Sequence, residues 1–191
     1  MKAARARSDK ATPPSHDEPR SPDQAADMLA LIKARRSVRR FTREPVTGEQ
    51  IELLLEAARW APTTFQCWRF VVVDEESLLS TVVSLAPGIL QRPTLLIVVC
   101  ADMDIILVKN IYPELAYQET ATATQNILLA ASALGLGGCF IASFSKAGIA
   151  RALNLPPHLE IHNLIALGHP AEAPDPPPRK PIAEIAFRNA L

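Results

Sequence analysis

Five arginines lie close together near residue 40, and they are the first group that could do chemistry. They fall within nine residues around a serine: Arg35, Arg36, Ser37, Arg39, Arg40 and Arg43. A guanidinium fork binds a phosphate through two parallel hydrogen bonds, and a neighbouring hydroxyl adds a further donor. The segment therefore indicates either a site for a phosphorylated ligand or a solvated basic face at a helix end. A nucleic-acid surface is a third interpretation, but no aromatic residues alternate with the basic ones.

A second polar segment follows at residues 61–68, with the sequence APTTFQCW. Thr63, Thr64 and Gln66 could donate hydrogen bonds to the polar edge of a flat ligand. The neighbouring aromatic residues, Phe65 and Trp68, offer apolar surface for the same ligand. The alternative is an ordinary connecting loop whose aromatic residues pack into the core.

The remaining motifs do not indicate a dinucleotide-binding loop, a metal site or a nucleophilic active site. Residues 135–138 (GLGG) precede an expected strand, whereas a dinucleotide-binding fingerprint follows a strand and opens a helix. We therefore interpret them as a helix terminator and a tight turn. His158 and His162 lie in an expected loop and strand, so they do not share a helical face, and we predict no metal site. No serine-nucleophile, zinc-protease or phosphate-loop motif occurs, and only Cys67 has a basic neighbour.

Composition limits the remaining classes. The chain has 191 residues, 48% of them hydrophobic, which fits one globular domain with a sizeable core. Its formal net charge is zero, so we expect neither a nucleic-acid nor a membrane partner. Its three cysteines form no CxxC pair, and no apolar run follows the basic residues of the first 25 positions. We therefore expect a cytoplasmic protein.

Apolar periodicity predicts alternating helices and strands. A helix is expected over residues 23–36, capped by Asp23, with Met28, Leu31 and Ile32 facing the core. A capping box from Thr47 to Gln50 opens a second helix that ends near residue 60. Further helices are expected over residues 75–85, 113–134 and 145–153, and strands over residues 69–74, 94–100, 139–143 and 161–167. The fold class is α+β, with helices around a small sheet.

Proline placement sets the domain limits. Of the 17 prolines, most lie in the head and tail of the sequence, where they interrupt regular structure. We expect a disordered tail over residues 1–23, a core domain over residues 24–169 and a proline-rich arm over residues 170–191.

Four segments, in order, resemble the FMN-dependent nitroreductase family. They are RRSVRRF at residues 35–41, AARWAPTTF at 57–65 with WRFVVV at 68–73, QNILLAASALGLG at 125–137, and IALGHP at 165–170 with RKP at 179–181. The resemblance spans about residues 28–187. It implies a central mixed or antiparallel sheet flanked by helices, an extended C-terminal arm, and a homodimer with FMN at the subunit interface. Residues of both chains would build each site.

The resemblance also implies roles for particular residues. Those matching the family's FMN phosphate and ribityl site are Arg35, Ser37 and Arg39, with Arg36 adjacent to them and Arg179 as the late basic residue. Those matching the loop that reaches across from the partner subunit are Pro62, Thr63 and Thr64, with Gln66 at the flavin's polar edge. Those matching the strand that faces the flavin ring near N5 are Phe140, Ile141, Ala142 and Ser143.

The implied activity is an NAD(P)H-dependent flavin oxidoreductase. Reducing equivalents would pass from NAD(P)H through flavin N5 to a nitroaromatic, quinone or similar small acceptor, in ping-pong turnover. The alternative is a protein that binds or stores FMN with little or no turnover. The sequence departs from the family in the second segment, where Pro62 and Trp68 stand two residues closer than usual and no Gln-Pro pair precedes the tryptophan. The positions of Ala142 and Ser143 also lack the Glu or Gly that the family often has.

Overall fold

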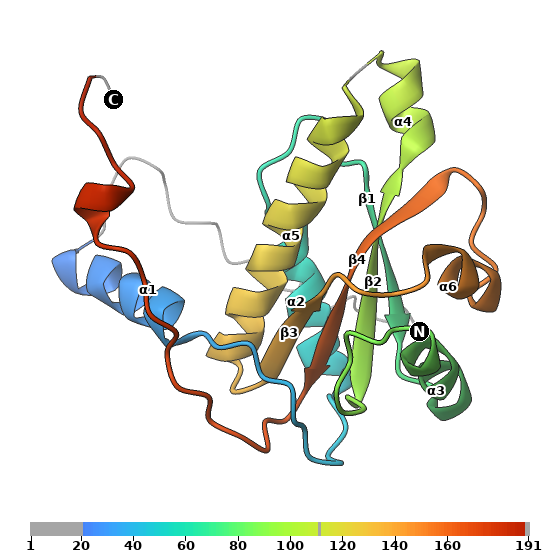
Figure 1. Ribbon diagram of the computed structural model, residues 1–191, viewed down its shortest axis with the longest axis horizontal. Helices are drawn as coiled ribbons and strands as arrows, with labels where there is room; N and C mark the ends of the chain where they lie inside the picture. The colour runs from blue at the N-terminus through green and yellow to red at the C-terminus, as the bar shows by residue number, and fades with distance from the viewer. Residues whose placement is uncertain (1–20, 111, 190–191) are drawn as a thin grey trace, which may run out of the picture.

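A four-stranded sheet forms the centre of the protein (Figure 1). The computed structural model describes residues 21–110 and 112–189. The strands are β1 (Trp68–Val73), β2 (Leu95–Asp102), β3 (Gly137–Ile141) and β4 (Leu159–Gly168). They pair in the order β1-β2-β4-β3, and every pairing is antiparallel. The predicted α+β fold with an antiparallel sheet flanked by helices is confirmed.

The central strand β2 organises the core because it is buried along its whole length. Its side chains alternate between two faces, as a strand requires. Leu95, Ile97 and Val99 belong to one apolar cluster, whereas Leu96 and Val98 belong to the other. Because β2 is buried on both faces, its sequence is a continuous run of mainly apolar residues and does not alternate with polar ones.

Helices cover both faces of the sheet. On one face lie α2 (Gly48–Arg59) and the long helix α5 (Pro113–Ala133), which share a cluster with β2 and β4. On the other face lie α3 (Glu76–Ser84) and α6 (Lys146–Ala152). A short helix α4 (Met103–Val108) and a 3₁₀ turn η1 (Ile182–Glu184) complete the secondary structure. The sequence pattern predicted neither of these two, because each is too short to show a helical period.

The predicted helix signals are mostly confirmed. The Thr47 side chain accepts from the Gln50 N–H, and the Gln50 side chain accepts from the Thr47 N–H, which is the expected capping box. Ser145 caps α6, and Pro113 begins α5. Gly135 has a φ of +73°, so it ends the helix region in the left-handed conformation, as predicted.

The first helix departs from the prediction in two ways. The helix α1 spans Pro22–Ala34, and its N-cap is Ser21 with a capping box to Gln24, not Asp23. It also buries none of its residues: Met28 and Ile32 are 46% and 45% exposed. The expectation that they face the core is wrong, because apolar spacing shows that a helix has an apolar face but not what that face packs against.

The third strand begins earlier than predicted. It spans Gly137–Ile141, so Ala142 and Ser143 lie just beyond its end. Gly137 and Gly138 therefore belong to the strand and not to a turn. A Cβ at Gly137 would lie 2.7 Å from Cγ1 of Val38, and one at Gly138 would lie 2.8 Å from a methyl group of Leu128. These glycines allow close approach of neighbouring segments.

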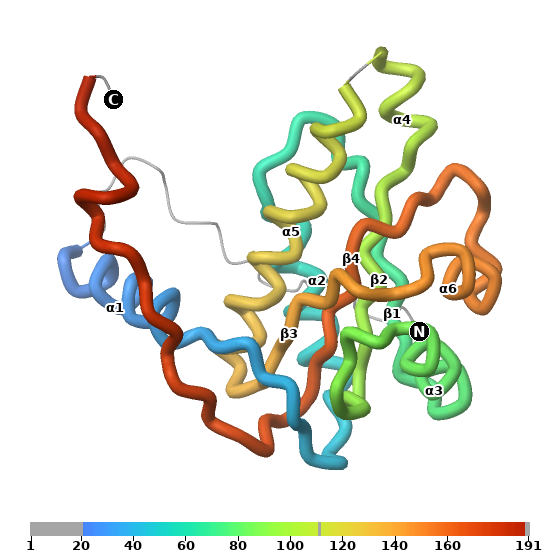
Figure 2. The backbone as a smooth tube through the Cα atoms, viewed as in Figure 1, coloured from blue at the N-terminus to red at the C-terminus, as the bar shows by residue number. Residues whose placement is uncertain are grey.

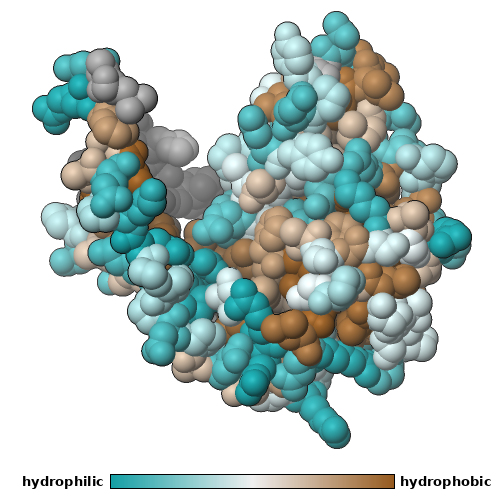
Figure 3. Space-filling view, viewed as in Figure 1, coloured by the Kyte–Doolittle hydropathy of each residue, from teal (hydrophilic) through white to brown (hydrophobic). Residues whose placement is uncertain are grey.

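Beyond β4 the chain leaves the body as an extended arm (Figure 2). Every described residue from 175 onward is exposed. The space-filling view shows α1 and the arm standing away from the body, with apolar residues on their surface (Figure 3). The predicted disordered tail covers residues 1–23, of which residues 1–20 lie outside the part of the chain that the structure describes. None of the helices in the described ranges combines the length and apolar character needed to cross a membrane.

Candidate functional site

The arginine-rich segment lies against the first residues of β3. Ser37 forms a parallel bridge with Gly138, and the Val38 N–H donates to the Gly138 carbonyl at 3.1 Å. Val38 is buried, whereas the two residues that follow it, Arg39 and Arg40, are exposed. The backbone is therefore fixed while the guanidinium groups remain accessible.

The start of the C-terminal arm holds the same segment from the other side. One carboxylate oxygen of Glu172 accepts from the Arg39 and Arg40 N–H groups at 2.7 and 3.2 Å. Phe41 forms an antiparallel bridge with Pro170, and the Ala171 N–H donates to the Arg40 carbonyl. Two chain segments about 130 residues apart thus define the shape of one basic surface.

The arginine side chains retain free positive charge. Within residues 21–110 and 112–189, no carboxylate lies within ion-pair distance of Arg35, Arg36 or Arg39. Burial raises the pKa of the Cys139 thiol on β3, and the charges of Arg39 and Arg35 oppose that rise. Unpaired guanidinium groups beside a rigid strand are suited to an anion such as a phosphate.

The far end of β3 carries the second group of predicted residues. Phe140 is 45% exposed, whereas Ile141 is buried, so only the backbone of Ile141 is available to a ligand. Ala142 and Ser143 are exposed immediately after the strand. The Ser143 carbonyl accepts from the Gly88 N–H at 3.0 Å, which fixes its direction. The strand has five residues, so roughly 16 Å separate its first residue, beside the arginine segment, from the residues that follow Ile141.

The polar loop of residues 62–66 lies elsewhere, beside the N-terminal part of α5. Its Thr64 and Phe65 N–H groups donate to Oε1 of Glu119 at 2.7 and 3.1 Å. The Cys67 N–H donates to Oε2 of Glu119 at 3.2 Å. Pro62, Thr63, Thr64 and Gln66 are exposed. The polar side chains of the loop therefore face outward, whereas Trp68, which follows it, is 7% exposed and packs into the core, as the connecting-loop alternative expects.

One chain does not bring all predicted site residues together. The arginine segment contacts β3 beyond the C-terminal end of α5, whereas the loop contacts Glu119 near its beginning. The part of α5 between Glu119 and the C-terminal end of the helix is roughly 20 Å long. Arg179 is exposed on the arm, and its one described hydrogen bond goes to the Pro178 carbonyl.

The cysteines are not reactive nucleophiles. Burial raises the pKa of Cys67 to about 12, and the neighbouring Glu119 carboxylate adds to the rise. Burial likewise raises the pKa of Cys100 to about 12. Arg69, which the sequence places near Cys67, pairs instead with Asp102 at 2.8 Å. Both of these thiols therefore stay protonated at neutral pH.

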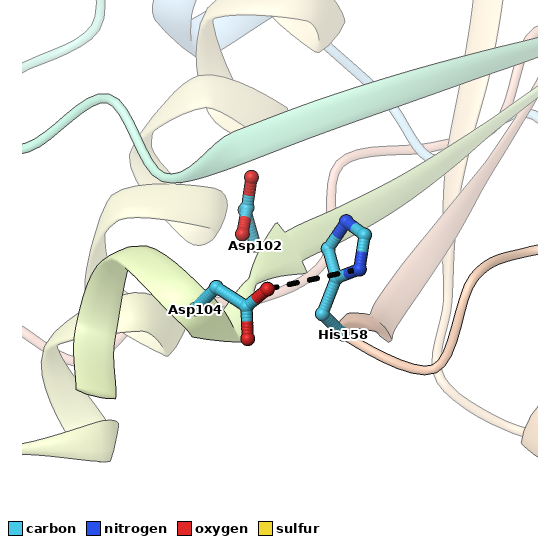
Figure 4. A group of neighbouring side chains, drawn as sticks. All are labelled: Asp102, Asp104 and His158. Atoms are coloured by element: carbon cyan, nitrogen blue, oxygen red, sulfur yellow. Dashed lines mark ion pairs between the residues drawn. The ribbon is translucent and has the colours of Figure 1, made fainter. Parts of the chain in front are cut away.

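Asp102, Asp104 and His158 form a separate cluster at the end of β2 (Figure 4). One potential ligand atom of each lies within 4.8 Å of the others. Arg69 already neutralises Asp102, while the Asp104 carboxylate is 69% exposed and lies 3.9 Å from the His158 ring. The positive charge of Arg69 beside the Asp102 carboxylate, which is the most buried of the three side chains, disfavours a cation at this cluster. The absence of a metal site stays a prediction.

Comparison with known proteins decides the family. The family model described as Nitroreductase family matches residues 32–94 and 81–169. The chain belongs to the nitroreductase family. Like the predicted fold class, the predicted family is confirmed, and the matched region covers the arginine segment, the loop and β3.

Individual relatives agree with this assignment. A protein of Methanothermobacter thermautotrophicus, assigned as an NADH dehydrogenase/NAD(P)H nitroreductase, is 33% identical over 78% of this chain and 80% of its own length. The oxygen-insensitive NADPH nitroreductase of Salmonella typhimurium is 30% identical over 84% of this chain and 73% of its own. A solved structure from Desulfovibrio desulfuricans, assigned as a nitroreductase in complex with FMN, is 32% identical with a TM-score of 0.76, covering 86% of this chain and 97% of that one. These names support the predicted NAD(P)H-dependent flavin oxidoreductase.

Sequence reasoning missed two acidic residues that shape this nitroreductase. Glu172 orders the arginine segment, and Glu119 orders the loop. A signal for Glu119 was present: it falls among Ala116, Ala123 and Ile127 on the apolar face of α5. An acid on such a face must find donors when the helix packs.

Proposed function

We propose that the protein is an FMN-dependent oxidoreductase that passes reducing equivalents from NAD(P)H to a small acceptor. The observation that carries the proposal is the basic surface against β3, where the guanidinium groups of Arg35, Arg36 and Arg39 have no carboxylate partner within the described ranges. In a family with an FMN-bound member, such a surface is the natural phosphate site.

The proposed site residues divide by task. Those that hold the phosphate and ribityl chain are Arg35, Arg36, Ser37 and Arg39, with Arg179 from the arm. Those that face the ring are Phe140, Ile141, Ala142 and Ser143, the buried Ile141 through its backbone. Those that reach from the other subunit are Pro62, Thr63, Thr64 and Gln66. The roughly 16 Å length of β3 supports one ligand lying along it, phosphate at Gly137 and ring at Ser143.

A homodimer is part of the proposal. In one chain the loop and the arginine segment lie at opposite ends of α5 (Figure 1). Exposed apolar side chains on α1 and the arm support a second copy as their partner: Met28, Leu29, Ile32, Ile182, Ile185 and Phe187. A soluble monomer rarely exposes so many apolar residues on projecting segments. The core domain of residues 24–169 and the closing role of residues 170–191 belong to the same proposal.

Bound FMN supplies the hydride chemistry, accepting reducing equivalents at N5 and releasing them to the acceptor. The chain's residues bind and orient it. In this proposal the guanidinium groups neutralise the phosphate, and the exposed residues after β3 contact the edge of the ring. The second substrate, whether a nitroaromatic, a quinone or a similar acceptor, would enter after the first product leaves, which is ping-pong turnover.

Steady-state kinetics test this proposal against FMN storage. The purified protein, reconstituted with FMN, should oxidise NADPH or NADH when a quinone or nitroaromatic is added. Plots of reciprocal rate against reciprocal donor concentration, at several acceptor concentrations, should give parallel lines. Intersecting lines would exclude ping-pong turnover. Bound FMN without any oxidation of NAD(P)H would favour storage.

A further inference from the structure

The loop of residues 63–67 depends on one buried carboxylate. Glu119 is only 3% exposed, yet no basic side chain within residues 21–110 and 112–189 pairs with it. Three backbone N–H groups, those of Thr64, Phe65 and Cys67, donate hydrogen bonds to its oxygens. If α5 needed only to pack on the sheet, an apolar residue would bury at lower cost. We therefore expect the carboxylate charge to serve the loop, whose N–H groups it accepts from.

The loop has few other supports. Thr63 Oγ1 accepts from the Gln66 N–H at 2.7 Å, but that contact lies within the loop. Gln66 has a φ of 52°, in the left-handed region that side-chain residues rarely adopt. Besides Glu119, three groups outside the loop donate hydrogen bonds to its carbonyls: the Asp102 N–H to Cys67, the Arg69 guanidinium to Gln66 at 3.2 Å, and the Thr122 hydroxyl to Pro62 at 3.4 Å. Loss of Glu119 would leave a strained, exposed turn without its central acceptor.

The charged form of Glu119 is what fits this arrangement. Burial raises the pKa of this carboxyl, but the Thr64 N–H, the Thr63 hydroxyl and Cys67 donate hydrogen bonds that more than offset it. The pKa therefore lies below its ordinary value, and the group is ionised at neutral pH. Both oxygens are engaged as acceptors, which a neutral amide cannot reproduce because its nitrogen is a donor.

We propose that Glu119 is a positioning residue of the flavin site: its carboxylate fixes the shortened loop so that Thr63, Thr64 and Gln66 face the flavin of the partner subunit. This inference rests on the proposed function. Glu119 itself acts through the loop, since its oxygens point to the backbone of residues 64–67.

Two variants of Glu119 test the inference in the full-length protein reconstituted with FMN. Glu119→Gln keeps the size but turns an N–H₂ group toward the Cys67 N–H, and Glu119→Asp keeps the charge with a shorter reach. Thr124→Val is the matched control: Thr124 is 1% exposed on the same helix, and its hydroxyl donates to the Thr120 carbonyl and to Asn163, not to the loop. The measurements are the Kd for FMN and the visible circular dichroism of bound flavin. Amide hydrogen exchange is measured on the FMN-free proteins.

The Glu119→Gln variant should bind FMN about ten-fold more weakly, as expected for lost hydrogen bonds to a charged group. Its bound flavin should show an altered visible circular dichroism spectrum, and the amides of residues 64, 65 and 67 should exchange faster while β2 stays protected. Glu119→Asp should fall between this variant and the unmodified protein, and it replaces Glu119→Gln if the latter does not fold. Thr124→Val should keep the FMN affinity of the unmodified protein.

Two results would overturn the inference and leave the proposed function standing. One is a folded Glu119→Gln variant with unchanged Kd and flavin spectrum. The other is an equal loss of FMN affinity in Thr124→Val, which would assign the effect to general destabilisation. Failure of the unmodified protein to bind FMN at all would instead contradict the proposed function, and the inference with it.

Discussion

At the scale of single residues, the unpaired guanidinium groups beside β3 make the sharpest prediction. Arg39→Ala should raise the Kd for FMN about ten- to a hundred-fold, because a charge-assisted hydrogen bond to phosphate is lost. Quenching of flavin fluorescence during titration measures the change. Arg43→Ala is the control, since Arg43 is an exposed arginine of the same segment outside the proposed site. Equal losses in both variants would show that only general basic charge matters.

His162 makes a prediction about pH. Burial lowers the pKa of this histidine, which stacks on Tyr117 and contacts the Thr120 hydroxyl at 2.9 Å. Below the ordinary pKa of 6.5, His162 is therefore protonated in the unfolded chain but stays neutral in the folded chain. The free energy of unfolding consequently falls as the pH drops below 6.5. His162→Asn should flatten the pH dependence of Tm between about pH 7 and pH 5. The control is His158→Asn, in the turn before β4, and an unchanged slope in His162→Asn would refute the assignment.

At the scale of elements, two capping boxes allow a paired test. Thr47 caps α2, which buries Leu54 and Ala58, whereas Ser21 caps α1, which buries nothing. Thr47→Ala should reduce the free energy of unfolding by about 1 kcal/mol, or roughly 2–4 °C in Tm. Ser21→Ala should leave the Tm unchanged when the subunit is kept monomeric by charged substitutions in the arm, because α1 buries no side chain within one chain. Thermal denaturation followed by circular dichroism measures both, and a matching loss in Ser21→Ala would mean that α1 stabilises the core.

The helices and strands differ in how well the sequence predicts them. Caps and apolar periods are local, so α2, α5 and the buried strand β2 were predicted within a few residues. The role of α1 was predicted wrongly because a spaced apolar face does not reveal what covers it. Gly137 and Gly138 were assigned to a turn because their real function, the close approach of Val38 and Leu128, depends on chain segments far apart in sequence. The role of Glu119 could not be predicted for the same reason, because its hydrogen-bond partners lie more than 50 residues away in the sequence.

At the scale of the whole molecule, the projecting arm predicts dimer formation. Ile185→Asp combined with Phe187→Asp places charges on two side chains that are 62% and 58% exposed in one chain. Sedimentation should show the unmodified protein at twice its 20.8 kDa mass and this variant shifted to a single chain with weakened FMN binding. The control is Leu107→Asp on α4, whose side chain is 72% exposed. A monomeric unmodified protein that binds FMN fully would contradict the shared site.

The central claim is that this chain binds FMN and passes electrons through it, and one spectrum tests it most directly. The visible absorption of the FMN-reconstituted protein should show flavin bands near ~450 nm that bleach when NADH or NADPH is added without oxygen. The bands should return when a quinone is added. Bands that persist in the presence of either nucleotide would contradict the oxidoreductase and leave a flavin-binding protein. A protein that stays colourless after incubation with FMN would contradict the cofactor itself.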